Sequence, residues 1–269
     1  MKASAISACY ISPAISVEQF ISDHFFLYLV AGSMSAYDGS REYKIKAGDY
    51  GIARRNHLAK YSKQPDNGKF EKVIIFFDQA FLKEFNDKYK FSAGPSKSAS
   101  AIIELAENKL VPDFIQSLAP YFNDKGAIDA AFLNVKRSEL LLILLKGDPE
   151  LANIFFDFSI PGKIDMEKFM NRNYTFNVSI ERFAYLTGRS LSAFKRDFEK
   201  IFNTTPSHWL VQKRLEEAYF LIDKKGKKPS DIYLDLGFQD LSHFSFAFKK
   251  LFGHTPKELT ERKKKIIFK

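Results

Sequence analysis

Short apolar runs rich in β-forming residues alternate with turn residues over the first part of the chain. Clusters of turn residues such as Ala47-Gly48-Asp49 separate the runs. The runs are five to eight residues long and comprise Phe25–Val30, Glu42–Lys46, Asp49–Arg54 and Phe70–Phe77. Closely spaced short strands with such turns are typical of a small sandwich or barrel. The pattern therefore predicts a β-rich region over residues 20–77.

From Asp78 onward the apolar spacing becomes that of helices. Three segments have suitable lengths and predict helices within residues 78–156: Asp78–Tyr89, Val111–Asn123 and Ile128–Lys146. In the last segment, Ile128, Phe132, Val135 and Leu142 fall on roughly one stripe. The stripe is more apolar than a solvent-facing helix requires, so we expect it to pack against a second subunit or against the β-rich region.

Two segments predict interruptions between the helices, one a loop and the other a domain boundary. Lys90–Ser100 contains Gly94-Pro95 and four serines, and is predicted to be a mobile loop. Pro161-Gly162 precedes a segment that is helical in pattern to its end. We therefore divide the chain into a domain of residues 1–160 and a domain of residues 161–269.

The second domain contains an internal repeat. Seven residues recur at an offset of 50 positions: Ser192, Phe194, Phe198, Lys200, Phe202, Thr205 and Pro206 reappear as Ser242, Phe244, Phe248, Lys250, Phe252, Thr255 and Pro256. This segment is two copies of one helical unit.

Each copy predicts a short helix, a turn with glycine, and a second helix. The first copy comprises Ile180–Leu186, a turn at Gly188, and Leu191–Phe202 capped by Ser190; the second comprises Ile232–Leu236, a turn at Gly237, and Leu241–Phe252 capped by Asp240. Thr-Pro pairs close both copies, and Thr255 with Glu258 predicts a capping box. The pattern is that of the helix-turn-helix. A linking helix from about Ser207 to Lys225 joins the copies.

The residues of the second domain resemble the AraC/XylS family of transcription regulators. The matching features are Arg214-Leu215 with Ala218 and Leu221, the Gly237-Phe238 turn, and the run from Phe248 to Pro256; the resemblance covers about Ile164–Glu261. The N-terminal half resembles the cupin-like sensory domains of that family through Tyr43–Tyr50.

The resemblance implies an α+β protein: an N-terminal cupin-like β-barrel with following helices, and a C-terminal all-α domain of two helix-turn-helix units joined by a linking helix. It implies sequence-specific binding of double-stranded promoter or operator DNA, modulated through the N-terminal domain by a small-molecule effector or a protein antagonist. We expect a homodimer that works with RNA polymerase. The effector, the operator and the sign of regulation stay open.

The second helix of each copy predicts which residues contact DNA. The phenylalanines at 194, 198 and 202, and at 244, 248 and 252, line one inward stripe. A recognition helix reads bases from its N-terminal turns, so we predict contacts from the opposite face. These candidates are Ser190, Ser192, Lys195, Arg196 and Glu199 in the first copy, and Gln239, Asp240, Ser242, His243, Ser245, Phe246 and Lys249 in the second.

Two of these candidates have open roles. Arg196 suits guanine or a phosphate equally well. Phe246 stands where the family commonly has a polar residue, and either a thymine methyl or contact with the neighbouring domain would explain it. Outside the two helices, Lys224-Lys225 and Lys227-Lys228 are expected to contact phosphates, whereas Arg262–Lys265 is expected to be an exposed tail.

The charge distribution agrees with a DNA-binding second domain. The net charge is +9, and residues 161–269 carry all of it, with 22 Lys and Arg against 13 Asp and Glu. A solvated basic surface without a function is the alternative explanation of this charge. At 45% hydrophobic and 27% charged residues, a disordered or collagen-like chain is excluded.

Other sequence features bear on location. The longest aliphatic run, Leu140–Leu145, is too short to cross a membrane, so we expect no membrane association. Cys9 is the single cysteine, and Met1–Tyr10 lacks the apolar core of a secretory signal. We expect a cytoplasmic, nucleoid-associated prokaryotic protein.

Enzyme motifs are absent from the sequence. It contains no Gly-x-Gly-x-x-Gly, phosphate loop, His-Glu-x-x-His or Gly-x-Ser-x-Gly pattern. His24 and His57 lack the spacing of a cupin metal site, so we expect no catalytic residues, metal or cofactor. The alternative is a cupin-type small-molecule-binding enzyme with a basic helical tail.

Overall fold

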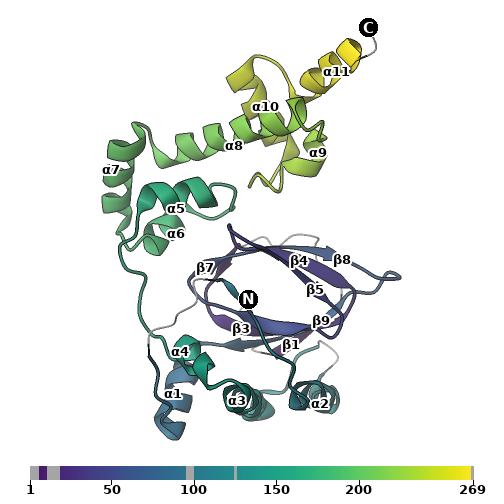
Figure 1. Ribbon diagram of the computed structural model, residues 1–269, viewed down its shortest axis with the longest axis vertical. Helices are drawn as coiled ribbons and strands as arrows, with labels where there is room; N and C mark the ends of the chain where they lie inside the picture. Colours follow the sequence, from purple (N-terminus) through teal and green to yellow (C-terminus); the bar gives the residue numbers. More distant parts are fainter. Residues whose placement is uncertain (1–5, 11–18, 95–99, 124–125, 268–269) are drawn as a thin grey trace. The chain divides into compact units, whose positions relative to one another are not determined.

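The protein is described here by a computed structural model that covers residues 6–10, 19–94, 100–123 and 126–267. These residues form two compact units: the N-terminal unit comprises residues 6–10 and 20–160, and the C-terminal unit comprises Gln19 and residues 161–267. The described strands all lie in the N-terminal unit, and the C-terminal unit is helical (Figure 1). The predicted α+β class is confirmed.

A five-stranded antiparallel sheet forms one layer of the N-terminal unit. Its order is β1-β9-β3-β6-β10, and its strands are β1 Ile6–Tyr10, β3 His24–Ala31, β6 Tyr50–Ala53, β9 Glu71–Phe77 and β10 Ile102–Glu104. Along β9 buried residues alternate with half-buried ones, as a pleated strand between two layers requires. Phe26 of β3 pairs with Ile52 and Ile75 and is fully buried, so it lies at the centre of the sheet.

A three-stranded sheet, ordered β5-β4-β8, faces this layer, and β2 pairs with β7 beside it (Figure 1). The bounds are β2 Phe20–Ile21, β4 Ser33–Tyr37, β5 Glu42–Lys46, β7 His57–Leu58 and β8 Lys60–Gln64. Of these, only β5 was predicted. Strands β4 and β8 contain serine and lysine at half-buried or exposed positions, so their composition does not indicate strands.

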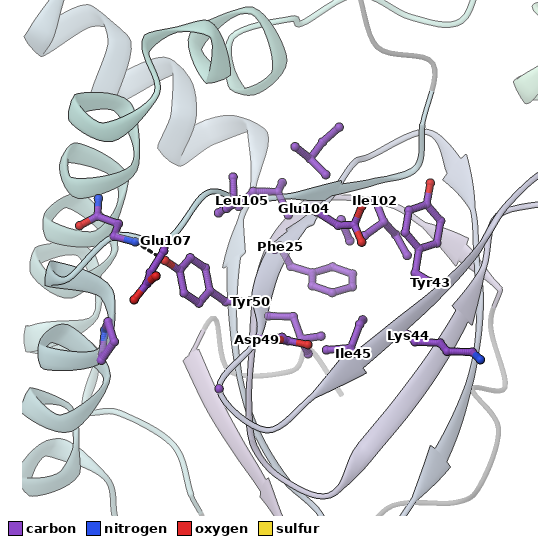
Figure 2. Close-up of a pocket in the computed structure, with 18 of the residues that line it drawn as sticks. Phe25, Tyr43, Lys44, Ile45, Asp49, Tyr50, Ile102, Glu104, Leu105 and Glu107 are labelled. Carbon is purple, nitrogen blue, oxygen red and sulfur yellow. Dashed lines mark hydrogen bonds between the residues drawn. The ribbon is translucent and has the colours of Figure 1, made fainter.

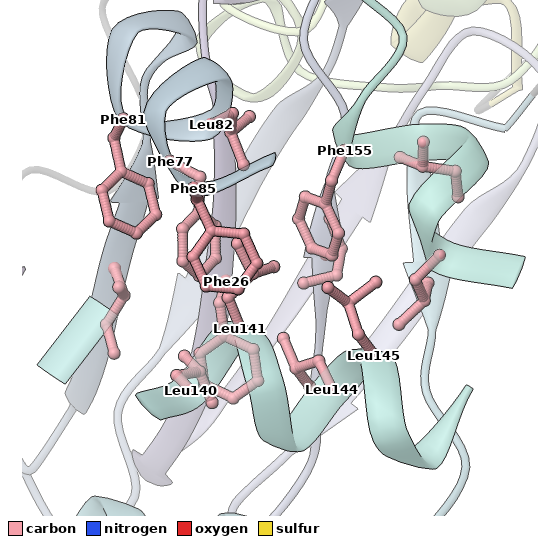
Figure 3. Close-up of a cluster of buried hydrophobic side chains, with 14 of the residues drawn as sticks. Phe26, Phe77, Phe81, Leu82, Phe85, Leu140, Leu141, Leu144, Leu145 and Phe155 are labelled. Carbon is pink, nitrogen blue, oxygen red and sulfur yellow. The ribbon is translucent and has the colours of Figure 1, made fainter. Parts of the chain in front are cut away.

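Helices cover the outer face of the five-stranded sheet. They are α1 Gln79–Tyr89, α2 Leu110–Ser117, α3 Ala130–Gly147 and α4 Ala152–Phe155, with 3-10 turns at Ala119–Tyr121 and Pro149–Leu151. Figure 3 shows Phe26 and Phe77 of the sheet against Phe85 of α1, Leu141 of α3 and Phe155 of α4. The three helices predicted for this region are present, although the second ends at Ser117 instead of Asn123.

The buried face of α3 is not the predicted stripe. Leu140, Leu141, Leu144 and Leu145 face the sheet, whereas Phe132 and Val135 are 48% and 64% exposed. The leucines form a continuous face on the opposite side of the helix, and this face buries more apolar surface. Of the predicted stripe, Ile128 is buried in the core against the sheet and Leu142 is half-buried against the same core, so these two residues do pack on the β-rich region. Phe132 and Val135 do not, and their packing against a second subunit stays a prediction.

The C-terminal unit consists of seven helices within the described residues. They are α5 Met166–Asn173, α6 Ile180–Leu186, α7 Leu191–Phe202, α8 Pro206–Asp223, α9 Pro229–Ile232, α10 Leu241–Phe252 and α11 Pro256–Ile267. Helices α6, α7 and α10 have the predicted bounds, and α8 is the linking helix. None of the described helices is both long and apolar enough to span a bilayer.

Three predictions differ from the structure or lie outside it. The helix predicted at Ile232–Leu236 is instead α9, which begins at Pro229 because proline favours the first helical position, and turns follow it up to Gly237. The backbone of Arg262–Lys265, predicted to be a tail, continues α11. Residues 95–99 of the predicted loop lie outside the described residues.

Candidate nucleic-acid interface and ligand cavity

The first helix-turn-helix is made by α6, a turn at Gly188, and α7. Gly188 has φ +67°, and a Cβ atom there would collide with the backbone of Gly162, so only glycine fits this turn. Ser190 caps α7 by accepting a hydrogen bond from the backbone N–H of Ala193 at 3.3 Å. These two residues fix the direction in which α7 leaves the turn.

The inner face of α7 is aromatic. Phe194 and Phe198 are fully buried, and Phe202 is half-buried. The ring centroids of Phe198 and Phe202 lie 5.7 and 4.7 Å from that of Trp209 in α8. The phenylalanine stripe therefore fastens α7 to the linking helix, which leaves the opposite face free for a partner.

The outer face of α7 is polar and exposed. All five candidates of the first copy lie on it or at its cap, and each is exposed: Ser190, Ser192, Lys195, Arg196 and Glu199. The Arg196 guanidinium lies 3.5 Å from Asp197, yet its side chain is 67% exposed. Asp197 also accepts a hydrogen bond from Arg189 at 3.3 Å. Burial acts to raise the pKa of Asp197, but the two arginines outweigh it and lower that pKa.

The second helix-turn-helix leads through Gly237 into α10. Asp240 caps α10 by accepting a hydrogen bond from the backbone N–H of His243 at 2.6 Å. Phe244 and Phe248 are fully buried and belong to a core that includes Leu215 and Ala218 of α8. Both recognition helices therefore pack against opposite ends of one linking helix.

The outer face of α10 holds the candidates of the second copy. Six of them are exposed, and Ser245 is half-buried: Gln239, Asp240, Ser242, His243, Ser245, Phe246 and Lys249. Phe246 is the most exposed of the large hydrophobic residues in α10, at 71%. The structure thus brings the candidates of each copy together on one face of one helix.

Arg214 of α8 ties the two copies together. Its guanidinium donates hydrogen bonds to the carbonyls of Tyr174 (2.7 Å), Phe176 (2.8 Å) and Gly237 (3.0 Å). Burial lowers the pKa of this guanidinium to about 10. Tyr174 and Phe176 precede the first helix-turn-helix and Gly237 is the turn of the second, so one side chain links both. In the sequence, Arg214 stands out only through the family resemblance, which predicts no contact for it.

Basic residues surround this unit. Lys224, Lys225, Lys227 and Lys228 are exposed where α8 ends, and Lys224 pairs with Asp223 at 2.8 Å. Lys195 and Lys200 of α7 are exposed, as are Lys249 and Lys250 of α10. Exposed cations beside two recognition helices form a surface that attracts phosphates.

A cavity of about 470 Å³ lies between the two sheets of the N-terminal unit (Figure 2). Its wall is apolar inside, with Phe25, Leu27, Ile45, Ala53 and Ile102. Charged residues gather toward the solvent, including Lys44, Asp49, Glu104, Glu107 and Lys109. The size and the apolar lining are those of small-molecule sites. The sequence does not reveal this cavity, because its lining comes from strands far apart in the chain.

Three tyrosines also line the cavity. The Tyr43 hydroxyl donates to Asp38 at 2.9 Å, and the Tyr50 hydroxyl donates to the carbonyl of Ala106 at 3.1 Å. The Tyr61 hydroxyl is buried and has no hydrogen-bond partner. Neither histidine of the N-terminal unit lines the cavity, and within the described residues no three His, Cys, Asp or Glu side chains cluster as metal ligands.

Two family models match the chain. Residues 24–154 match an ExsA N-terminal regulatory domain, and residues 183–262 match a helix-turn-helix domain. The first match spans β3 to β10 and the helices up to α4. The second spans both helix-turn-helix units and most of α11.

The curated relatives are transcription regulators. The chain is 22% identical over 254 residues to the thermoregulatory protein LcrF of Yersinia pestis, covering 93% of each chain. It is 21% identical to the transcriptional regulator ExsA of Pseudomonas aeruginosa, covering 85% of this chain and 82% of ExsA. Among solved structures, ToxT of Vibrio cholerae matches at 15% identity with a TM-score of 0.40, covering 95% of this chain and 97% of ToxT.

Proposed function

The chain belongs to the AraC/XylS family of transcription regulators. From this premise we propose that its two domains have separate roles, DNA binding and the modulation of that binding. Residues 161–269 bind promoter DNA through the outer faces of α7 and α10. Residues 1–160 form the sensory and association domain, a cupin-like module that modulates DNA binding.

One observation carries the DNA-binding part of the proposal. Two twelve-residue helices, offset by 50 positions, each bury two phenylalanines completely and expose polar residues on the other face. They lie in a domain that holds the whole excess of positive charge. A recognition helix needs an anchored apolar side and a hydrogen-bonding free side, and each of these helices has both.

We propose that the modulating partner acts on the N-terminal unit. The cavity between the sheets favours a small-molecule effector, because it is concave, mainly apolar and of ligand size. A protein antagonist would instead need an exposed apolar surface, and Phe132 with Val135 on α3 is the candidate for it.

The remaining partners follow from the role of a promoter-bound regulator. We propose contact with RNA polymerase, a homodimeric state, and a cytoplasmic, nucleoid-associated location in a prokaryotic cell. We also propose that the protein is not an enzyme. The relatives LcrF and ExsA are transcription regulators, which favours a regulator over a cupin enzyme with a basic tail.

Binding of the full-length chain to duplex DNA tests the proposal. A selection from a random duplex library should yield a preferred site, and affinity for that site should fall about 10³–10⁵-fold between 50 and 200 mM salt. Failure of the folded chain to bind any duplex in a salt-dependent way would contradict the proposal.

Two variants on the proposed face separate base contact from phosphate contact. Arg196→Ala should cost about 1–3 kcal/mol at one base pair and relax specificity there. Lys249→Ala should weaken all sequences alike and reduce the salt slope by about one. Equal loss of specificity in both variants would contradict the assignment of a base contact to Arg196 and a phosphate contact to Lys249.

A further inference from the structure

The two recognition helices place different chemistry at one equivalent position. Helices α7 and α10 have the same length and the same cap position, and each residue of α7 corresponds to the residue 50 positions later. Serine matches serine at positions 192 and 242. The next residue on the same face, one turn further on, is Arg196 in α7 and Phe246 in α10.

Phe246 is an isolated apolar side chain on a polar surface. It is 71% exposed, and its neighbours one turn before and after it are Ser242 and Lys249. The other exposed apolar residues of α10, Leu241 and Leu251, are each five residues away, which places them about 140° around the helix. Protein interfaces need a contiguous apolar patch, whereas Phe246 is surrounded by hydroxyl and ammonium groups.

The chemistry of the major groove limits what a phenylalanine there can read. Base edges present hydrogen-bond donors and acceptors, which a phenyl ring cannot match, and one apolar group, the C5 methyl of thymine. We propose that Phe246 recognises a thymine in the sub-site of the second helix-turn-helix by packing on that methyl group. The proposal rests on the proposed function, because it requires α10 to enter the groove.

The assignment makes the two sub-sites chemically different. Arg196 presents a charged guanidinium group to its sub-site, whereas Phe246 presents an apolar ring from the equivalent position of α10. A single chain therefore binds its site in one orientation, because exchanging the sub-sites would put the guanidinium against a methyl group and the ring against polar edges.

Removing the methyl group from DNA tests the contact directly. The full-length chain is first used to select a site from a random duplex library, and each invariant thymine is then replaced in turn by deoxyuridine, which lacks only the C5 methyl. We expect one replacement to weaken the wild-type chain about fourfold, the effect of burying one methyl group. Phe246→Ala should bind more weakly than wild type and show no response to that replacement.

Two further variants sharpen the test. Leu251→Ala removes an exposed apolar side chain from another side of α10, and it should keep the wild-type response to deoxyuridine. Phe246→Arg restores the residue type of the first copy, and a new selection should move the preferred base at that position from thymine to guanine. Far-ultraviolet circular dichroism checks that each variant is folded.

The outcomes separate this proposal from the proposed function. If the wild-type chain binds duplex DNA but ignores deoxyuridine at every thymine, or if Phe246→Ala keeps the discrimination, the thymine contact is overturned. A change in sedimentation of Phe246→Ala without a change in discrimination would assign the ring to a second copy and also overturn it. Absence of salt-dependent binding by the wild-type chain would instead refute the proposed function.

Discussion

His24 is a buried base in the middle of the N-terminal unit. Its side chain is 3% exposed at the start of β3, and its Nδ1 accepts a hydrogen bond from the backbone N–H of Arg55 at 3.3 Å. Its Nε2 has no partner. Burial lowers the pKa of His24 to about 3, and the charges of Arg55 and Arg54 act in the same direction, while Asp157 opposes them weakly. The imidazole is therefore neutral in the folded protein at neutral pH.

This buried imidazole should make the N-terminal unit sensitive to mild acid. The pKa of His24 in the folded protein lies below its unfolded value of 6.5, so the unfolded chain binds more protons between about pH 6.5 and 3. The contribution of the neutral imidazole to the free energy of unfolding is therefore fully present above pH 6.5 and is lost as the pH falls below that value. Between pH 7 and pH 5 the free energy of unfolding should fall by about 2 kcal/mol. Thermal unfolding at each pH, followed by the infrared band of the β-sheet, measures the change.

The control is His24→Asn, which keeps an acceptor for the Arg55 N–H and does not titrate. The pKa values of Asp38 and Asp78 are also lowered. Because both groups titrate below the ordinary carboxyl pKa, they change the free energy of unfolding only at a more acidic pH than His24 does. His24→Asn should therefore be nearly flat between pH 7 and pH 5. An unchanged slope in this variant would assign the effect to another group.

Spacing in the sequence predicts which single residues face inward, but not what they contact. The i, i+4 pattern correctly predicted the buried phenylalanines of α7 and α10, and the same pattern puts Phe246 outside. The partners of Arg214 lie 23 to 40 residues away from it in the chain, so no local pattern reveals them. The burial of His24 likewise depends on Phe155 in α4, which packs edge-on against its ring.

At the scale of elements, glycine turns decide how the recognition helices are placed. Gly237 and Gly253 both have positive φ, +83° and +77°, and Gly253 follows α10 as its C-cap. Their surroundings differ. A Cβ on Gly237 would lie 2.7 Å from the carbonyl oxygen of Thr175 and 2.9 Å from Cζ of Arg214, while a Cβ on Gly253 would meet nothing within 4 Å.

The two glycines form a matched pair for mutagenesis. Gly253→Ala should cost about 1 kcal/mol, the conformational penalty alone. Gly237→Ala should cost at least about 3 kcal/mol, since the crowded methyl also displaces Arg214 from its carbonyl partners. Urea unfolding followed by the fluorescence of Trp209, the single tryptophan, measures both. Equal costs would show that the turn can shift to admit a methyl group.

Local signals explain which elements the sequence could predict. Ser190 and Asp240 mark the starts of α7 and α10, and both accept the capping hydrogen bonds expected of them. Such signals are weak in β4 and β8, where polar residues alternate with few apolar ones. Helix α9 was misplaced because the apolar residues from Ile232 to Leu236 continue past its end into turns.

At the scale of the whole molecule, the exposed side of α3 is a candidate surface for association. Phe132 packs on Tyr121 with ring centroids 4.9 Å apart, and Val135 is 64% exposed beside it. We expect the double variant Phe132→Lys with Val135→Lys to convert a dimer into a monomer in sedimentation experiments, because two charges on the contact would repel their copies. Val30→Lys, which alters an exposed residue of β3, is the control and should leave the dimer intact. A dimer that persists in the folded double variant would place the interface elsewhere.

The last prediction concerns how one chain spans two sub-sites of DNA. Helix α8 has 18 residues and is therefore about 27 Å long, and Arg214 fixes it to both helix-turn-helix units. The recognition helices are thus held by a rigid spacer. The spacer is somewhat shorter than one turn of DNA, which is about 34 Å long. Inserting five base pairs between the sub-sites turns one of them to the opposite face of the duplex, so only one unit can bind. Affinity should then fall by about 10²–10⁴-fold, the usual gain from linked binding.

A ten-base-pair insertion separates rigidity from mere linkage. It returns both sub-sites to the same face but moves them about 34 Å further apart. Because α8 cannot lengthen, a rigid pair should bind this site as weakly as the five-base-pair insertion, whereas units on a flexible tether would recover much of the lost affinity. Electrophoretic mobility shifts on the three sites measure the difference. Recovery on the ten-base-pair site would show that Arg214 and α8 do not hold the units as one body.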